Sequence, residues 1–302
     1  MQTKSIVFFG SGPVAAKSLA LLAQNFTIEA VVTKPATVVQ MSSIVSGDRV
    51  YSAGNKLELD DLIVAKQFSS QLAILIDFGI IVSEKVIQSF EYGIINSHFS
   101  ILPELRGADP ISFAILSGQA KTGVSLMLVD KGMDTGKIIT SKVLKIDPGD
   151  TTPSLTEKLI TLSNGLLTDF VPKYIDGTIK PKTQPHPDRA TYSRKLSKKD
   201  GLIDWSKPAE AIEREIRAFI DWPKSRTNLA GKDVIITKAH AAPSNSPGSK
   251  PGGVEQSLLE QGILMIETAK GTLCVDELKP AGKKEMPVQA FLAGYKHLLK
   301  KD

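Results

Sequence analysis

The sequence predicts an α/β domain with a mostly parallel sheet, followed by a smaller domain that we expect to be a β-barrel. In the first half, short apolar runs alternate with segments whose apolar residues recur at helical spacing. Apolar strands that are buried on both faces and separated by helices are typical of a parallel sheet. Beyond a proline-rich stretch, several short β-rich runs replace this alternation.

The first strand and helix show the alternation clearly. Residues 5–9 are a short apolar run that ends at Gly10, and residues 13–24 carry apolar residues at helical spacing. The turn Gly10-Ser11-Gly12-Pro13 has Ala15 where a dinucleotide fingerprint needs its third glycine, so we interpret it as a tight structural turn. Further strands are expected at 28–32, 72–76, 93–96 and 123–129, and further helices at 59–68, 110–117 and 153–175.

The expected domain boundary is a segment rich in proline, residues 180–187. Proline at this density resists helix formation and favours an extended linker. We therefore expect a first domain at 1–179, a linker at 180–202 and a second domain at 203–302. In the second domain we expect a helix at 208–219, strands at 233–239, 262–267 and 272–278, and turns at Pro247-Gly248 and Gly252-Gly253.

The composition excludes several classes of protein. The single cysteine, Cys274, rules out a disulfide framework and a cysteine-rich zinc site, and we expect no bound metal. No apolar window predicts a membrane span and no signal peptide is recognised, so we expect a cytoplasmic protein without a membrane partner. Residues 1–179 hold 15 basic and 17 acidic residues, whereas residues 180–302 hold 22 and 15. This asymmetry has two explanations, a polyanionic partner or a solvated lysine-rich surface.

Asn96 and His98 stand two residues apart where a predicted strand ends. This spacing puts both side chains on one face, and parallel sheets bind ligands beyond the carboxyl ends of their strands. The amide suits a developing oxyanion, and the imidazole exchanges a proton near neutral pH. Asp134, in a loop between two predicted strands, is a candidate to orient the histidine. Taken singly, each residue also has a structural explanation, such as Asp134 capping a turn.

One run resembles the signature of the 10-formyltetrahydrofolate-dependent formyltransferases: Asn96-Ser97-His98-Phe99-Ser100-Ile101-Leu102-Pro103-Glu104-Leu105-Arg106-Gly107. Asp134-Thr135-Gly136 matches a second family motif, 38 residues from Asn96 as in the family. The resemblance implies a Rossmann-like catalytic domain in which His98 accepts a proton, Asn96 holds the oxygen, and Asp134 fixes the tautomer and stabilises the cation of His98. It implies that 10-formyltetrahydrofolate binds along Phe78, Gly79, Ile80, Ser100, Ile101, Leu102 and Pro103.

Motifs in the rest of the chain resemble the methionyl-tRNA branch of this family. They are Ala190-Thr191-Tyr192, Ile203-Asp204-Trp205, Ile216-Arg217-Ala218-Phe219, Trp222-Pro223, Lys279-Pro280-Ala281-Gly282-Lys283-Lys284 and Phe291-Leu292-Ala293-Gly294-Tyr295. The resemblance implies formyl transfer to the α-amino group of initiator methionyl-tRNA by a monomer. It also implies that residues 203–302 form an OB-like domain that contacts tRNA phosphates through lysine and arginine.

The chain departs from the family pattern at three places. The family usually has an arginine- and lysine-rich loop after the second strand, and here Lys34 is the only basic residue of the segment 34–47. Asp77-Phe78-Gly79 stands where Ala-Tyr-Gly is usual, and Asp109 stands where alanine is usual.

Three alternative functions share parts of this pattern. The first is a formyltransferase for glycinamide ribonucleotide or a nucleotide-linked amino sugar, which would not need the basic C-terminal part. The second is a hydrolase that releases formate from the same folate. The third is a non-catalytic tRNA-binding protein, which would not need all three of Asn96, His98 and Asp134.

Overall fold

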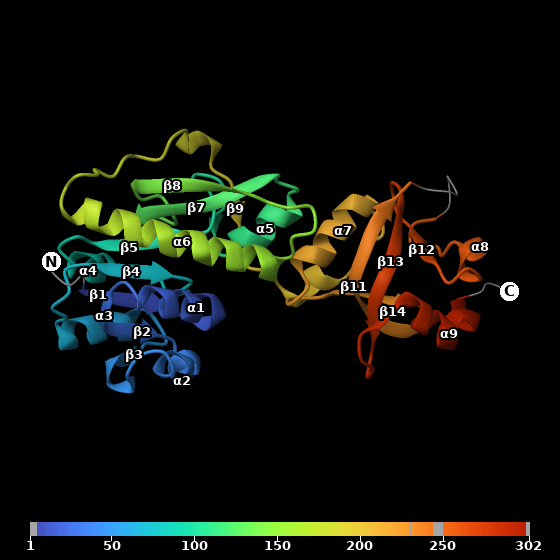
Figure 1. The fold of residues 1–302 in the computed structure, drawn as a ribbon, viewed down its shortest axis with the longest axis horizontal. Coiled ribbons are helices and arrows are strands. Elements are labelled where there is room, and N and C mark those ends of the chain that lie inside the picture. Colours follow the sequence, from blue (N-terminus) through green and yellow to red (C-terminus); the bar gives the residue numbers. More distant parts are fainter. Residues whose placement is uncertain (1–4, 230, 244–249, 300–302) are drawn as a thin grey trace. The chain divides into compact units, whose positions relative to one another are not determined.

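The computed structural model describes residues 5–229, 231–243 and 250–299, so the expected Pro247-Gly248 turn lies outside the described residues. The chain divides into two compact units (Figure 1). The first unit comprises residues 1–110, 121–145 and 156–194, and the second comprises residues 111–120, 146–155 and 195–302. Within the described ranges, no helix combines the length and apolar character needed to cross a bilayer.

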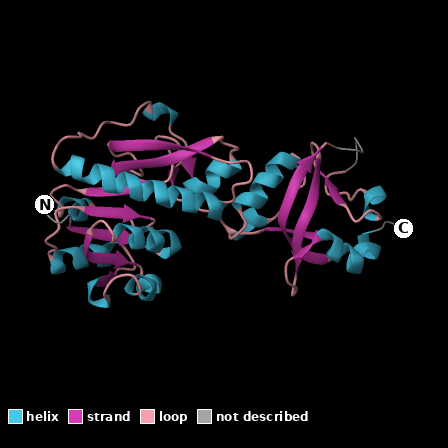
Figure 2. Ribbon diagram, viewed as in Figure 1, coloured by secondary structure: helices cyan, strands magenta, loops and turns pink. Residues whose placement is uncertain are grey.

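A seven-stranded sheet forms the centre of the first unit (Figure 2). Its strands are β1 (Ser5–Gly10), β2 (Thr27–Thr33), β3 (Val50–Ser52), β4 (Ala73–Ile76), β5 (Ile94–His98), β7 (Lys121–Leu128) and β8 (Ile138–Lys145). They lie in the order β3-β2-β1-β4-β5-β7-β8, in which the first five are parallel and β7 and β8 are antiparallel to their neighbours. The mostly parallel α/β sheet predicted from the sequence is therefore confirmed.

Buried apolar residues explain why β1 lies inside this sheet, between β2 and β4. Val7, Phe8 and Phe9 are inaccessible to solvent although they alternate between the two faces. The Phe9 ring packs edge-on against Phe78 at 5.5 Å between centroids. A Cβ atom on Gly10 would lie 2.8 Å from the Ile76 carbonyl oxygen, so close packing alone requires glycine at this turn.

Six α-helices lie between residues 12 and 175. They are α1 (Gly12–Leu22), α2 (Val38–Ser42), α3 (Lys56–Lys66), α4 (Glu84–Gln88), α5 (Pro110–Leu116) and α6 (Thr152–Ile175). The Asn55 side chain accepts hydrogen bonds from the first-turn amides of α3, and Ser83 does the same for α4. The short elements α2, α4 and β3 and the lysine-rich strand β8 were not expected, because none of them has a strong apolar period.

The second unit contains an antiparallel sheet. Its strands are β10 (Ser225–Leu229), β11 (Lys232–Ala242), β12 (Leu264–Glu267), β13 (Thr272–Pro280) and β14 (Met286–Pro287), and its helices are α7 (Ala209–Ala218), α8 (Gln256–Leu259) and α9 (Val288–Leu299). The strands pair in the order β10-β11-β13-β12, with β14 beside β13. The described strands leave this sheet open, because no pairing joins β10 to β12, so the predicted barrel is not confirmed.

The core of the second unit lies between this sheet and its helices. Ile212 and Ile216 stand four residues apart on α7 and are buried together with Leu273 of β13 and Phe291 of α9. This core explains why α9 forms although the sequence analysis did not predict it. Its buried residues Val288, Phe291, Leu292 and Leu299 recur at helical spacing.

Candidate active site

Strand β5 presents two of the predicted catalytic residues on one face of the sheet. Asn96 and His98 alternate with Ser97, whose hydroxyl lies 2.6 Å from that of Ser163 on α6. The β5 strand is also where the sheet changes from parallel pairing, with β4, to antiparallel pairing, with β7. The strand order reverses between β1 and β4, the neighbour of β5, and ligands of α/β sheets commonly bind beyond the carboxyl ends of the strands near such a reversal.

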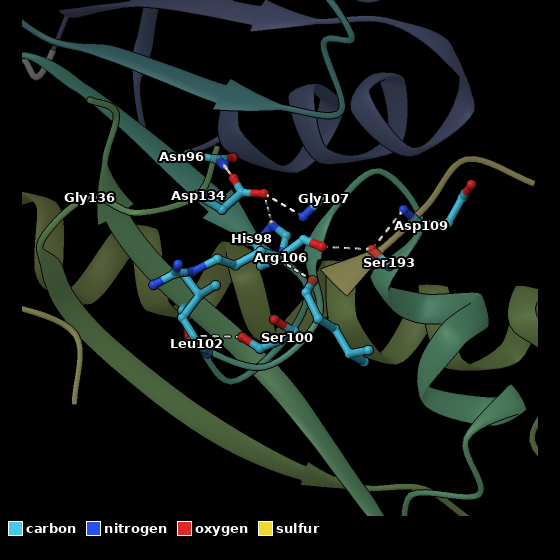
Figure 3. Close-up of polar contacts among 12 residues, drawn as sticks. Asn96, His98, Ser100, Leu102, Arg106, Gly107, Asp109, Asp134, Gly136 and Ser193 are labelled. Atoms are coloured by element: carbon cyan, nitrogen blue, oxygen red, sulfur yellow. Dashed lines mark hydrogen bonds and ion pairs between the residues drawn. The ribbon is translucent and has the colours of Figure 1, made fainter. Parts of the chain in front are cut away.

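The structure brings Asn96, His98 and Asp134 together (Figure 3). Asp134 lies in the loop 129–137 that connects β7 to β8. Its Oδ1 accepts a hydrogen bond from Asn96 Nδ2 at 3.2 Å, and its Oδ2 accepts one from the Gly107 amide at 2.8 Å. The same Oδ2 lies 3.7 Å from Nδ1 of the buried His98 ring. One carboxylate therefore contacts the amide and the imidazole at once.

A backbone carbonyl fixes the tautomer of His98. The ring Nε2 lies 2.9 Å from the Leu105 carbonyl oxygen, which can only accept, so Nε2 carries the hydrogen. The sequence analysis expected Asp134 to fix the tautomer, but Asp134 lies beside Nδ1 and not beside Nε2. The lone pair of neutral Nδ1 therefore lies beside a carboxylate, and a proton gained at Nδ1 would be attracted to Asp134.

Close packing explains the glycine of the Asp-Thr-Gly motif. Asp134 has a φ of +52°, a left-handed conformation that aspartate tolerates better than most residues. Two residues later, a Cβ atom on Gly136 would lie 1.7 Å from the Leu128 carbonyl oxygen. The loop therefore returns against β7, where no side chain fits at position 136.

The residues expected to line the folate site fall into two groups. In the segment 100–103, Ser100 and Leu102 are buried, whereas Ile101 and Pro103 remain half-buried. The Ser125 hydroxyl of β7 donates to the Ser100 carbonyl at 2.8 Å and accepts from the Leu102 amide at 3.1 Å. Sequence reasoning missed Ser125, although it is a polar residue at the centre of an apolar strand.

The second group follows β4, and its three residues differ in their exposure to solvent. Phe78 is buried against Phe9 in the core, whereas Gly79 is exposed and Ile80 is half-buried. Large apolar side chains nearby in sequence stay exposed: Ile81 after β4 is 78% exposed and Met133 after β7 is 66% exposed.

Two departures from the family pattern interact with each other. Partial removal from water raises the pKa of Asp77, the negative charge of Asp109 raises it further, and the positive charge of Lys34 opposes both effects. Asp77 has a φ of +49°. A Cβ atom on the following Gly79 would lie 2.8 Å from Nζ of Lys34. Lys34 therefore lies beside this turn.

Residues from the predicted linker hold the loop after β5. Thr191 Oγ1 accepts from the Leu105 amide at 2.8 Å, and the Thr191 carbonyl accepts from the Arg106 amide at 2.9 Å. Strand β6 (Arg106–Gly107) pairs in parallel with strand β9 (Tyr192–Ser193). A Cβ atom on Gly107, whose φ is +107°, would lie 2.2 Å from the Ser193 carbonyl oxygen. Sequence reasoning used Thr191 and its neighbours only as a family motif and missed this contact.

One group of three side chains within the described residues could hold a metal ion. His240 of β11 and Cys274 and Asp276 of β13 place one ligand atom each within 4.8 Å of one another. The His240 ring already lies 3.1 Å from Asp276 at the surface of the second unit. Burial, together with the charge of Asp276, raises the pKa of the Cys274 thiol.

Comparison with protein families covers both units. Residues 4–171 match the formyl transferase family, and residues 195–296 match the family described as formyl transferase, C-terminal domain. A methionyl-tRNA formyltransferase of Myxococcus xanthus is 33% identical over 309 residues, which covers 98% of this chain and 96% of the relative.

Solved structures share the fold at lower identity. An N-formyltransferase of Helicobacter canadensis, solved with folinic acid and dTDP-3-aminofucose, is 20% identical and aligns with a TM-score of 0.66 over 91% of this chain and 99% of its own. HypX of Aquifex aeolicus, solved with tetrahydrofolic acid, is 15% identical, with a TM-score of 0.63 over 98% of this chain and 48% of its own. The matches to both family regions and to a full-length relative show that the chain belongs to the formyl transferase family, among the methionyl-tRNA formyltransferases.

Proposed function

We propose that the chain transfers the formyl group of 10-formyltetrahydrofolate to the α-amino group of initiator methionyl-tRNA, as a monomer in the cytoplasm. One observation carries this proposal: Asn96, His98 and Asp134 are in contact in a chain whose full-length relatives are methionyl-tRNA formyltransferases. An amide, an imidazole and a carboxylate that converge at a strand end are suited to acyl transfer.

His98 is the proposed proton acceptor. When bound, the folate supplies the formyl group, whose carbon forms a bond to the amine as its bond to N10 of the folate breaks. The attacking amine must be neutral, and α-amino groups titrate at about 7.7–8.0, so a base of moderate strength is sufficient. Nδ1 of His98 takes the amine proton beside Asp134 and returns it to the departing nitrogen.

Asn96 is the proposed donor to the formyl oxygen as that oxygen gains negative charge. Its Nδ2 carries two hydrogens, of which one points to Asp134 Oδ1. The second is left for the substrate, so the contact with Asp134 also orients the amide. Loss of one such donor typically lowers turnover about 100- to 1000-fold.

The residues that remain accessible fit a folate. We propose that Gly79, Ile80, Ile101 and Pro103 contact the ligand, while the buried Phe78, Ser100 and Leu102 support them. The hydrogen bonds of Ser125 to the segment 100–103 fix the shape of this wall.

We propose that residues 1–179 form the catalytic domain, residues 180–202 a linker and residues 203–302 a tRNA-binding domain of OB-like type. The excess of basic residues beyond residue 180 supports a polyanionic partner for the C-terminal domain. Lys283 and Lys284, on the exposed turn between β13 and β14, are candidates for phosphate contacts.

The test is formyl transfer from labelled 10-formyltetrahydrofolate to several acceptors under single-turnover conditions. The acceptors are initiator methionyl-tRNA, uncharged initiator tRNA, methionine methyl ester and a nucleotide-linked amino sugar. We expect label in the α-amide of methionyl-tRNA, and His98→Ala serves as the inactive control. Label on the amino sugar alone, or formate released at the same rate without any acceptor, would contradict the proposal.

A further inference from the structure

We propose that Gln184, in the proline-rich linker, is a positioning residue that sets the geometry between His98 and Asp134. The inference rests on the proposed function, because it concerns the same transfer site. Gln184 is 4% exposed although its segment was predicted to be an extended linker. A buried amide in such a segment is unusual, because buried polar side chains need hydrogen-bond partners.

Every polar atom of the Gln184 side chain has a partner. Nε2 donates to the Asp134 carbonyl oxygen at 2.7 Å and to the Gly136 carbonyl oxygen at 3.0 Å. Oε1 accepts from Nη2 of the buried Arg106 at 2.6 Å. One amide therefore connects the Asp-Thr-Gly loop to the loop that follows β5.

The two connected loops supply the partners of both His98 ring nitrogens. On one side, Asp134 presents Oδ2 at 3.7 Å from Nδ1. On the other side, Arg106 directly follows Leu105, whose carbonyl accepts from Nε2, and directly precedes Gly107, whose amide donates to Asp134. A shift of either loop would therefore change the distance between the proton-accepting nitrogen and the carboxylate.

The backbone around Gln184 is itself fixed. Lys182 exchanges two hydrogen bonds with Ile138 at the start of β8, at 2.7 and 2.8 Å. This pairing holds the linker against the sheet two residues before Gln184. The backbone near Gln184 is therefore held in place by hydrogen bonds other than those that the Gln184 side chain makes in the site.

The contact with Arg106 is a second reason why position 184 requires the side-chain oxygen of a glutamine. The Arg106 side chain is buried, and its Nε has no hydrogen-bond partner among the described residues. Its remaining contacts are Gln184 and, at 3.4 Å, the Tyr192 hydroxyl. Loss of the Gln184 oxygen would leave this buried cation with still fewer partners, which is costly.

Two substitutions of Gln184 and one control separate the contributions of the amide donors, the amide oxygen and the side-chain length. Gln184→Glu keeps the length and the acceptor for Arg106, but it removes both donors and directs a carboxylate at two carbonyl oxygens. Gln184→Asn keeps all the groups on a side chain that is one methylene too short. Gln88→Glu makes the same chemical change at an exposed position of α4 and is the matched control.

The first measurement is the kinetics of the full-length variants with 10-formyltetrahydrofolate and initiator methionyl-tRNA. We expect Gln184→Glu to lower kcat about 10- to 100-fold, the size of effect that a misplaced catalytic group produces, while both KM values stay within about twofold. The kcat of Gln184→Asn should lie between those of wild type and Gln184→Glu, and the kcat of Gln88→Glu should equal that of wild type. An unchanged kcat with a lower melting temperature would show a purely structural role and overturn the proposal.

A double-mutant cycle tests whether Gln184 acts through Asp134. In an Asp134→Asn background, Gln184→Glu should lower kcat by less than about threefold, because the group that it positions is already lost. An equal loss in both backgrounds would overturn the inference, since it would mean that Gln184 acts independently of Asp134.

A spectroscopic measurement separates this inference from the proposed function. Nitrogen-15 NMR of labelled histidine, with His98 identified from the His98→Ala spectrum, reports which ring nitrogen carries the hydrogen. We expect the Nε2–H form in wild type and a changed population in Gln184→Glu, whatever the acceptor substrate is. An unchanged His98 spectrum in Gln184→Glu would overturn the inference, whereas absence of transfer to methionyl-tRNA by wild type would overturn only the proposed function.

Discussion

Two segments of the first unit contribute to the same site by different means. The signature segment, residues 96–107, supplies Asn96 and His98 and is recognisable as a motif in the sequence. The linker segment, residues 182–193, supplies Gln184, Thr191 and the strand β9, which contact the backbone and Arg106 of the first unit. The signature segment thus provides reacting groups, whereas the linker segment provides their positions. A sequence motif identifies the residues that react, but it gives little indication of the residues that position them.

The largest expected effect is at the reacting groups themselves. Asn96→Ala, His98→Ala and Asp134→Ala should each lower kcat about 100- to 1000-fold while the protein stays folded, because each removes a donor, a base or its counter-charge. Turnover and circular dichroism of the three variants would check this. Near-wild-type transfer by all three would show that the site is elsewhere.

The next effect tests where the two segments touch. Gly107→Ala should lower the free energy of unfolding by about 3 kcal/mol, because left-handed strain and overpacking each cost about 1–3 kcal/mol and a Cβ atom there would meet the Ser193 carbonyl. Urea unfolding measures the change. Gly165→Ala in α6 is the matched control, since nothing lies within 4 Å of its Cβ and the variant should be as stable as wild type or more so. Equal stability of both variants would contradict close contact between the segments.

A milder change addresses a single hydrogen bond of the linker segment. Thr191→Val keeps the shape of the side chain but removes the acceptor for the Leu105 amide, whose carbonyl holds His98. We expect kcat to fall about tenfold, the cost of about 1.4 kcal/mol for an unpaired amide, with rescue in Thr191→Ser. A wild-type rate in Thr191→Val would mean that the pairing of β6 with β9 holds the loop without this bond.

The smallest effect concerns a segment that lacks the family's basic residues. Residues 34–47 include the short helix α2, on which Val39 is exposed, and Lys34 is the only basic residue of the segment. We expect weak discrimination between initiator and elongator methionyl-tRNA, raised severalfold by a lysine- and arginine-rich loop grafted between Pro35 and Met41. The ratio of kcat/KM values for the two tRNAs measures it. Lys195, Lys198 and Lys199 of the predicted linker, with Lys283 and Lys284, could take over the phosphate contacts of the missing basic loop. Strong native discrimination that survived neutralisation of these five lysines would contradict this prediction.

Sequence alone was sufficient for features with a local period or a motif. The strands β1, β2, β4 and β5 and the helix α6 follow from their patterns of apolar residues. The family motifs singled out Asn96, His98 and Asp134, which the structure brings together. Strand β8 was missed because only one of its residues is buried and two are lysines, Lys142 and Lys145. The predicted barrel required knowledge of which distant strands pair, and no local pattern supplies that knowledge.

The support of the site was harder to predict for a related reason. Gln184 stands among prolines, where no apolar period reveals burial, and its partners are two backbone carbonyls, 48 and 50 residues away, and the Arg106 side chain, 78 residues away. Ser125 is one serine in an apolar strand, and the sequence does not show which loop its hydroxyl meets. Both residues bond to backbone atoms of the site loops, and such contacts leave no complementary side chain in the sequence to indicate them.

Cys274 provides a single site for covalent labelling of a thiol. It is the only thiol in the sequence, and it lies half-buried on β13 of the second unit. A maleimide fluorophore would therefore attach at one position and report on the C-terminal unit alone. Because burial raises the pKa of this thiol and the thiolate is the reactive form, labelling should be slow at neutral pH and faster in mildly alkaline buffer.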